Sequence, residues 1–135
     1  MGDAELPARG RLTLTTSSIR LAVCQLNPGQ SVPGWATGGE FWTVTGTSSE
    51  LSVVCELSRV PDGVQTSATW RALVVQGPLT HQVVGVLASV SSALARAEVP
   101  IFAISTYQTD WILVPEESLE VARAALRGAG HTVPD

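Results

Sequence analysis

The sequence predicts an α+β fold of two similar units, each an antiparallel sheet with its helices on one face. The main observation is an internal echo. Residues 41–56 (FWTVTGTSSELSVVCE) resemble residues 101–116 (IFAISTYQTDWILVPE) at a displacement of 60 positions, which pairs Glu50 with Asp110. Each copy reads as an apolar strand, a short polar turn and a second apolar strand, the pattern of a β-hairpin. Repeated supersecondary units indicate a duplicated small domain.

A second echo and a helical stripe support the same fold. Residues 21–25 (LAVCQ) resemble the end of the apolar run WRALVVQ at 70–76 when displaced by 51 positions, so the repeat extends beyond the hairpins. Residues 81–98 carry apolar side chains at helical spacing, namely Val83, Val86, Leu87, Val90, Leu94 and Ala97. That spacing predicts an amphipathic helix with one buried face.

The first unit is expected to span residues 11–65 and to be poor in helix. Arg11–Thr16 and Arg20–Leu26 read as two strands, and Asn27-Pro28-Gly29 is strong turn chemistry. Ser31–Gly39 is short and contains Pro33, so it allows at most a turn or two of helix. The first hairpin follows, with residues 47–49 at its tip, and the turn signal Pro61-Asp62-Gly63 marks the connector between the units.

The second unit is expected to span residues 66–135 and to be complete. It reads as β-α-β-β-α-β, with strands at 70–76, 101–106, 111–114 and 131–133 and helices at 81–98 and 116–127. This order predicts a ferredoxin-like sheet with two helices on one face. Arg123 and Arg127 near the end of the second helix suit its dipole, and Gly128 and Gly130 are stop signals.

Composition narrows the function classes. The chain has 135 residues and a net charge of −4, and its eight cationic residues are all arginines scattered along the sequence. We therefore expect no nucleic-acid footprint. No apolar run reaches the roughly 20 residues of a membrane span, and the N-terminus lacks the layout of a signal peptide, so a cytoplasmic protein is expected.

The two cysteines, Cys24 and Cys55, lie in apolar runs and are expected to be buried free thiols. A disulfide or a metal site is the alternative, although nothing near either cysteine has ligand spacing. Motifs for a serine nucleophile, a phosphate loop, a zinc protease or a dinucleotide are absent from the sequence. We therefore expect no enzyme, no cofactor and no metal.

The stretch GPLTHQVVGVLASVSSALARAEVPIFAISTYQTDWILVPEESLEVA resembles the second domain of small tandem ACT-domain proteins, distantly similar to the CASTOR-type arginine sensors. The resemblance is strongest over residues 70–131 and continues through residues 40–61. It implies two ACT units and a regulatory protein, with an amino acid or related effector bound at an interface between units. It also implies a homodimer and a regulated partner protein. Arginine itself is disfavoured, because no carboxylate stands at the start of the first helix, in residues 80–83.

The same resemblance implies the ligand contacts, at the start of the first helix of the second unit and after the following strand. These positions are Thr80, His81, Gln82, Val83, Gly85, Ser105, Thr106, Tyr107 and Asp110. Free N–H groups at a helix start suit a ligand carboxylate, and the Asp110 carboxylate suits an ammonium group. Some of these positions also have a plainer interpretation: Asp110 as a turn cap, His81 as a solvated side chain, and Gly85 as a packing residue. The alternative function is an ACT-type dimerisation or interaction module without a ligand.

Overall fold

The computed structural model describes residues 11–77 and 85–135, which divide into two compact units. Residues 19–70 form one unit, called here the inserted unit. The residues up to Ser18 together with residues 71–135 form the other, called the host unit. The sequence placed a single boundary between residues 65 and 66. By contacts, the chain passes from one compact unit to the other twice, because the long strands β1 (Leu14–Leu26) and β4 (Gln65–Val75) each begin in one unit and end in the other. The division into residues 11–65 and 66–135 stays a prediction.

The host unit contains the predicted hairpin and both predicted helices. After β4 come α2 (Val86–Arg96), β5 (Phe102–Ser105), β6 (Asp110–Pro115), the 3-10 turn η3 (Glu116–Ser118) and α3 (Leu119–Gly128). The strand order within this unit is β5-β6-β4-β1. The strand expected at 131–133 is reduced to one parallel bridge between Thr13 and Thr132. The coarse α+β architecture with an antiparallel hairpin is therefore as predicted.

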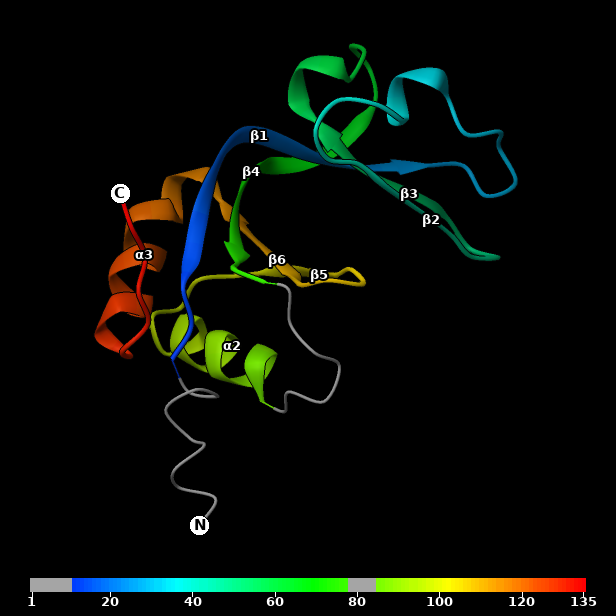
Figure 1. Ribbon diagram of the computed structural model, residues 1–135. Coiled ribbons are helices and arrows are strands. Elements are labelled where there is room, and N and C mark those ends of the chain that lie inside the picture. Colours follow the sequence, from blue (N-terminus) through cyan, green and yellow to red (C-terminus); the bar gives the residue numbers. More distant parts are fainter. Residues whose placement is uncertain (1–10, 78–84) are drawn as a thin grey trace. The chain divides into compact units, whose positions relative to one another are not determined.

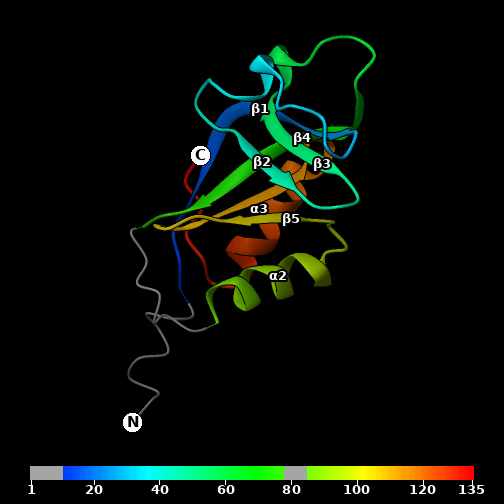
Figure 2. The ribbon, with the colours of Figure 1, turned by 90° about the vertical axis from the view of Figure 1, so that its right-hand side faces the viewer.

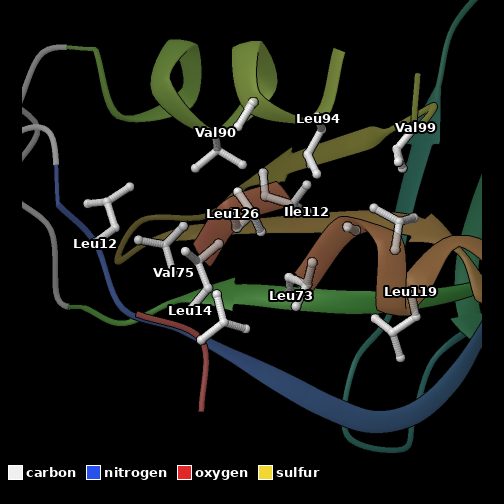
Figure 3. Packing of buried hydrophobic residues seen from close by; sticks show 14 of the residues in the cluster. Leu12, Leu14, Leu73, Val75, Val90, Leu94, Val99, Ile112, Leu119 and Leu126 are labelled. Atoms are coloured by element: carbon white, nitrogen blue, oxygen red, sulfur yellow. The ribbon is translucent and has the colours of Figure 1, made fainter. Parts of the chain in front are cut away.

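One apolar cluster holds the host unit together. Figure 1 and Figure 2 show α2 and α3 in this unit, and Figure 3 shows Val90 and Leu94 of α2 turned toward Ile112 of β6 and Leu126 of α3. These four side chains are fully buried, as are Leu73 and Val75 of β4. Both helices therefore cover the same face of the host sheet, as the period of about 3.6 residues in the helix sequences requires.

Both host helices end with the same backbone arrangement. Val99 N donates to Leu94 O after α2, and His131 N donates to Leu126 O after α3, each at 2.9–3.0 Å. Such a bond requires a left-handed residue just before its donor. That residue is Glu98 (φ 61°) after α2 and Gly130 (φ 98°) after α3.

The inserted unit has the strand order β2-β3-β1-β4, with β2 at Thr43–Gly46 and β3 at Leu51–Glu56. The two strands predicted at 11–16 and 20–26 are one continuous strand, β1. The prediction of a break was wrong, because Ser17-Ser18-Ile19 contains no glycine, proline, asparagine or aspartate to turn the chain.

The inserted unit has 3-10 turns where the host unit has helices. They are η1 (Gly34–Ala36) and η2 (Leu57–Arg59), as the short Pro- and Gly-containing segments predicted. Its own apolar cluster consists of Ala22 and Cys24 of β1, Ala36 of η1, and Val53 and Cys55 of β3.

The two hairpins share one geometry, but at a displacement of 59 positions rather than 60. Val44 pairs with Val53 in one, and Ala103 pairs with Ile112 in the other. The bounds of β2 and β3 become those of β5 and β6 at the same displacement. In a strand, a slip of one residue exchanges the two faces. The predicted pairing of Glu50 with Asp110 was therefore wrong, and Glu50 corresponds to Thr109.

Candidate functional site

The turn of the β5–β6 hairpin is built around one threonine. Thr106 N donates to Thr109 O at 2.8 Å, Thr106 Oγ1 donates to the same oxygen at 3.0 Å, and Thr109 N donates back to Thr106 Oγ1 at 3.2 Å. Side-chain bonds of this kind stabilise tight turns. The turn therefore holds the exposed Tyr107 and the residues on either side of it in a fixed backbone frame.

Ser105 and Asp110 face each other across the base of this turn. They are a register pair of the hairpin, and Ser105 Oγ donates to Asp110 Oδ1 at 2.5 Å. Ser105 is exposed and Asp110 is half-buried. The pair presents a carboxylate with one oxygen engaged, a group that accepts hydrogen bonds from a cation such as an ammonium ion.

Thr109, which is not among the predicted ligand contacts, links the hairpin to the host sheet. Its hydroxyl donates to Val75 O at the end of β4. The spacing Thr106-x-x-Thr109 was available in the sequence, and the same spacing stands at Thr47-x-x-Glu50 in the first hairpin. The contact with Val75 joins segments 34 residues apart, so no local pattern could have revealed it.

The structure places only part of the predicted ligand site. Thr80, His81, Gln82 and Val83 lie outside the described residues. Gly85 is the exposed N-cap of α2 and has φ 84°, a left-handed conformation that favours glycine. A Cβ at this position would meet no atom within 4 Å, so backbone conformation rather than close packing accounts for the glycine. Ser105, Thr106, Tyr107 and Asp110 are brought together at the hairpin, with Tyr107 83% exposed.

His131, which is not among the predicted site residues, is 4% exposed and bonded on both ring nitrogens. Leu12 N donates to Nδ1 at 3.1 Å, and Ser89 Oγ lies 3.1 Å from Nε2. Burial lowers the pKa of His131 below its usual value of 6.5.

Both cysteines are free and buried, as predicted. Burial raises the pKa of Cys24 to about 11, with a further contribution from Cys55, and burial also raises the pKa of Cys55. Thiolate is the reactive form of cysteine, so neither side chain has the character of a nucleophile at neutral pH.

Three further features of the described residues concern metal binding, membrane crossing and a hollow between helices. No group of three or more His, Cys, Asp and Glu side chains within 11–77 and 85–135 could hold a metal ion. In the same part of the chain, no helix is both long and apolar enough to cross a membrane. A hollow of about 270 Å³ between the C-terminal halves of α2 and α3 is lined by Ala93, Arg96, Ala97, Ala125, Gly128 and Ala129.

Known proteins share this arrangement. Residues 65–128 match the family model described as ACT domain, and residues 20–63 match a second model described as an N-terminal domain. A protein from Agrobacterium tumefaciens with a crystal structure is 33% identical over 92% of each chain, with a TM-score of 0.86. This chain belongs to that protein's family, and it contains an ACT domain.

More distant structures share the fold. A protein of unknown function from Vibrio cholerae, described as a possible transport protein, is 20% identical over 96% of this chain and 98% of its own, with a TM-score of 0.74. Aspartate kinase from Clostridium acetobutylicum is 14% identical (TM-score 0.62) over 83% of this chain and 33% of its own. The regulatory subunit of aspartate kinase from Thermus flavus is 13% identical (TM-score 0.55) over 86% of this chain and 95% of its own. At these identities the likeness shows a shared fold.

Proposed function

We propose that this protein is a non-catalytic regulator that binds an amino acid or a related small metabolite at an interface between ACT units. The match of residues 65–128 to the ACT domain is the observation that carries the proposal. The same fold serves in a protein named as the regulatory subunit of aspartate kinase, which supports a regulatory role. In this proposal the inserted unit is a second, helix-poor ACT-like unit, and the protein acts as a homodimer on a partner protein in the cytoplasm. The two free thiols are typical of a reducing compartment.

The proposed ligand contacts are the predicted residues around the β5–β6 turn and the start of α2. The Asp110 carboxylate would receive the ammonium group of the ligand, with Ser105 and Thr106 fixing its position. Residues 80–83 and Gly85 would receive the carboxylate at backbone N–H groups. A zwitterionic ligand matches a site with an anion at one end and N–H donors at the other.

Calorimetric titration of the protein with each common amino acid tests this function. We expect one or a few of them to bind, and Asp110→Asn to weaken binding at least about tenfold, because a charge-assisted bond is replaced by a neutral one. Asp62→Asn is the matched control, since Asp62 is exposed in a turn of the inserted unit. A folded protein that binds none of these ligands would contradict the proposal.

The second candidate is an ACT-type interaction module without a ligand. The bond from Ser105 to Asp110 favours it, because the carboxylate already has a partner within the chain. The absence of a carboxylate in residues 80–83 points the same way. This candidate predicts a dimer by sedimentation equilibrium whose dissociation constant is unchanged by every amino acid tested.

A further inference from the structure

We propose that His131 is the proton-sensitive latch that ties the N-terminal residues 11–14 to α2 and to the C-terminal segment of the host unit. The latch consists of Leu12, Ser89 and His131, and it operates whether or not the ACT domain binds an effector. Protonation of the imidazole opens it and frees the N-terminal residues from the host unit.

The hydrogen bonds fix the protonation state of the closed latch. A backbone N–H can only donate, so the 3.1 Å contact from Leu12 N makes Nδ1 an acceptor without a proton. The proton of the neutral ring is then on Nε2, which donates to Ser89 Oγ at 3.1 Å. An imidazolium carries a proton on both nitrogens, so its Nδ1–H would point at the Leu12 N–H and the bond would be lost.

Other backbone bonds among the described residues also hold the segment 11–14. Thr132 N donates to Leu12 O at 2.8 Å, and Leu14 N donates to Thr132 O at 2.9 Å, so both involve the residue next to His131. Gln76 N donates to Thr13 O at 2.7 Å. The Leu12 side chain, labelled in Figure 3, lies in the host cluster. His131 and its neighbour Thr132 therefore connect the segment 11–14 with α2 and with the C-terminal segment.

Among the described residues, no charged side chain near the latch favours the protonated form of His131. The charged side chains on the segments packed there are Arg11, Arg96 on α2, Glu120, Arg123 and Arg127 on α3, and Asp135. Both carboxylates lie within 4 Å of arginines: Glu120 of Arg123 at 3.6 Å, and Asp135 of Arg127 at 2.9 Å. Arg96 lies seven residues beyond Ser89, about 10 Å along the helix axis. Burial is the cause of the lowered pKa of His131.

The sign of the pH effect follows from that direction. The pKa of His131 is lower in the folded protein than the 6.5 of an unperturbed histidine, so the closed latch prefers the neutral ring. Its contribution is fully present above about pH 6.5 and is lost as the pH falls toward the folded-state value. Over that range, the population of the open latch rises by up to about tenfold per pH unit.

Hydrogen exchange of single amides, corrected for intrinsic rates, tests the latch between about pH 7.5 and about pH 5. We expect protection of the Leu12 and Leu14 amides to fall with the slope above, while the core amide of Val90 keeps its protection. In His131→Asn, the side-chain oxygen replaces Nδ1 as the acceptor without titrating, so the Leu12 profile becomes flat. His81→Gln removes the only other histidine and keeps the wild-type profile.

Three results would overturn the latch. Leu12 and Val90 could lose protection by the same factor, which indicates global acid unfolding. The profile of His131→Asn could equal that of the wild type. Nitrogen chemical shifts of the unmodified protein could show the proton of neutral His131 on Nδ1. This last measurement needs no variant, so it decides the question even if His131→Asn does not fold.

Discussion

The hairpins β2–β3 and β5–β6 have the same backbone plan, yet only the second leads into a full helix. Both turns start with a threonine whose N–H donates to the carbonyl three residues on, at 2.9 Å for Thr47 and 2.8 Å for Thr106. Both second strands run into a 3-10 turn, η2 or η3. In the host unit this turn continues as α3, starting with Leu119 in the helical conformation.

In the inserted unit, Val60 at the corresponding place has φ −80° and ψ 123°, and Pro61 follows. A proline disfavours the helical conformation of the residue before it, so the helix ends after one turn. Pro61 thus accounts for the missing helix after the first hairpin. Because the inserted unit has 3-10 turns in place of helices, side-chain hydrogen bonds hold one of its loops.

The side chains of Glu56 and Arg59 make these hydrogen bonds. Glu40 N donates to Glu56 Oε2 at 2.6 Å, and Arg59 donates from Nε to Trp35 O at 3.1 Å and from Nη2 to Thr37 O at 3.2 Å. The two charged side chains therefore anchor the loop that replaces the helix. Charge-assisted bonds of this kind are the stronger class of hydrogen bond.

Truncating the buried side chain of β6 should give the largest effect. Ile112 is fully buried under α2 and α3, so Ile112→Ala is expected to lower the free energy of unfolding by about 2–5 kcal/mol. Urea titration of the variant measures the change. Ile104→Ala on β5 is the matched control, because Ile104 is only half-buried and should cost less than half as much. Equal losses would mean that the register does not decide which face is covered.

The loop anchor should give the next largest effect. A Cβ on Gly39 would overlap Glu56 Oε2, so Gly39→Ala displaces the carboxylate from Glu40 N. Losing a bond to a charged group costs about 1.5–3 kcal/mol, in addition to about 1–2 kcal/mol for a left-handed alanine.

Gly29→Ala isolates the second of these two costs. Gly29 has φ 76°, close to the 79° of Gly39, but a Cβ there would meet nothing within 4 Å. The difference in unfolding free energy between the two variants measures the anchor. A difference near zero would show that Glu56 moves aside freely.

Local chemistry in the sequence predicted the hairpins, the two helices and the short turns, because each depends on residues close together in the chain. The insertion of one unit into the other was not predictable in this way. It depends on β1 continuing through Ser17-Ser18-Ile19, and on which distant strands it joins.

The register of the repeat was missed by one residue for a related reason. Similar side chains align Val44 with Ile104, whereas the turn threonines Thr47 and Thr106, 59 positions apart, set the strand pairing. At the candidate site, the proximity of Ser105 and Asp110 follows from hairpin geometry alone. The bonds of Thr109 to Val75 and of His131 to Leu12 are tertiary, so only the structure reveals them.

Substitutions at the two helix ends of the host unit should have smaller effects on stability, of opposite sign. Glu98 and Gly130 both have positive φ, and a non-glycine residue in this conformation costs about 1–2 kcal/mol. Glu98→Gly should therefore stabilise the protein by up to about that amount, and Gly130→Ala should destabilise it by a similar amount. Thermal unfolding by circular dichroism gives both signs. Destabilisation by Glu98→Gly would mean that the Glu98 side chain contributes more than its backbone conformation costs.

Exchanging core residues between the two units should give the smallest change in the free energy of unfolding. At the displacements that relate the units, Cys24 and Cys55 correspond to Val75 and Val114, and all four side chains are at most 1% exposed. The double replacement Cys24→Val with Cys55→Val therefore gives the inserted unit the host residues at these positions. Because valine is close to cysteine in size and is apolar, the loss of unfolding free energy should stay below about 1.5 kcal/mol.

The same thiols report on the closure of the inserted core. Their raised pKa values and their burial predict that a disulfide reagent at neutral pH reacts with them only on the unfolding timescale. Fast labelling of the native protein, or a loss well above 1.5 kcal/mol in the double variant, would show that these positions are not simple packing sites. The inserted unit would then differ from the host unit in its core as well as in its helices.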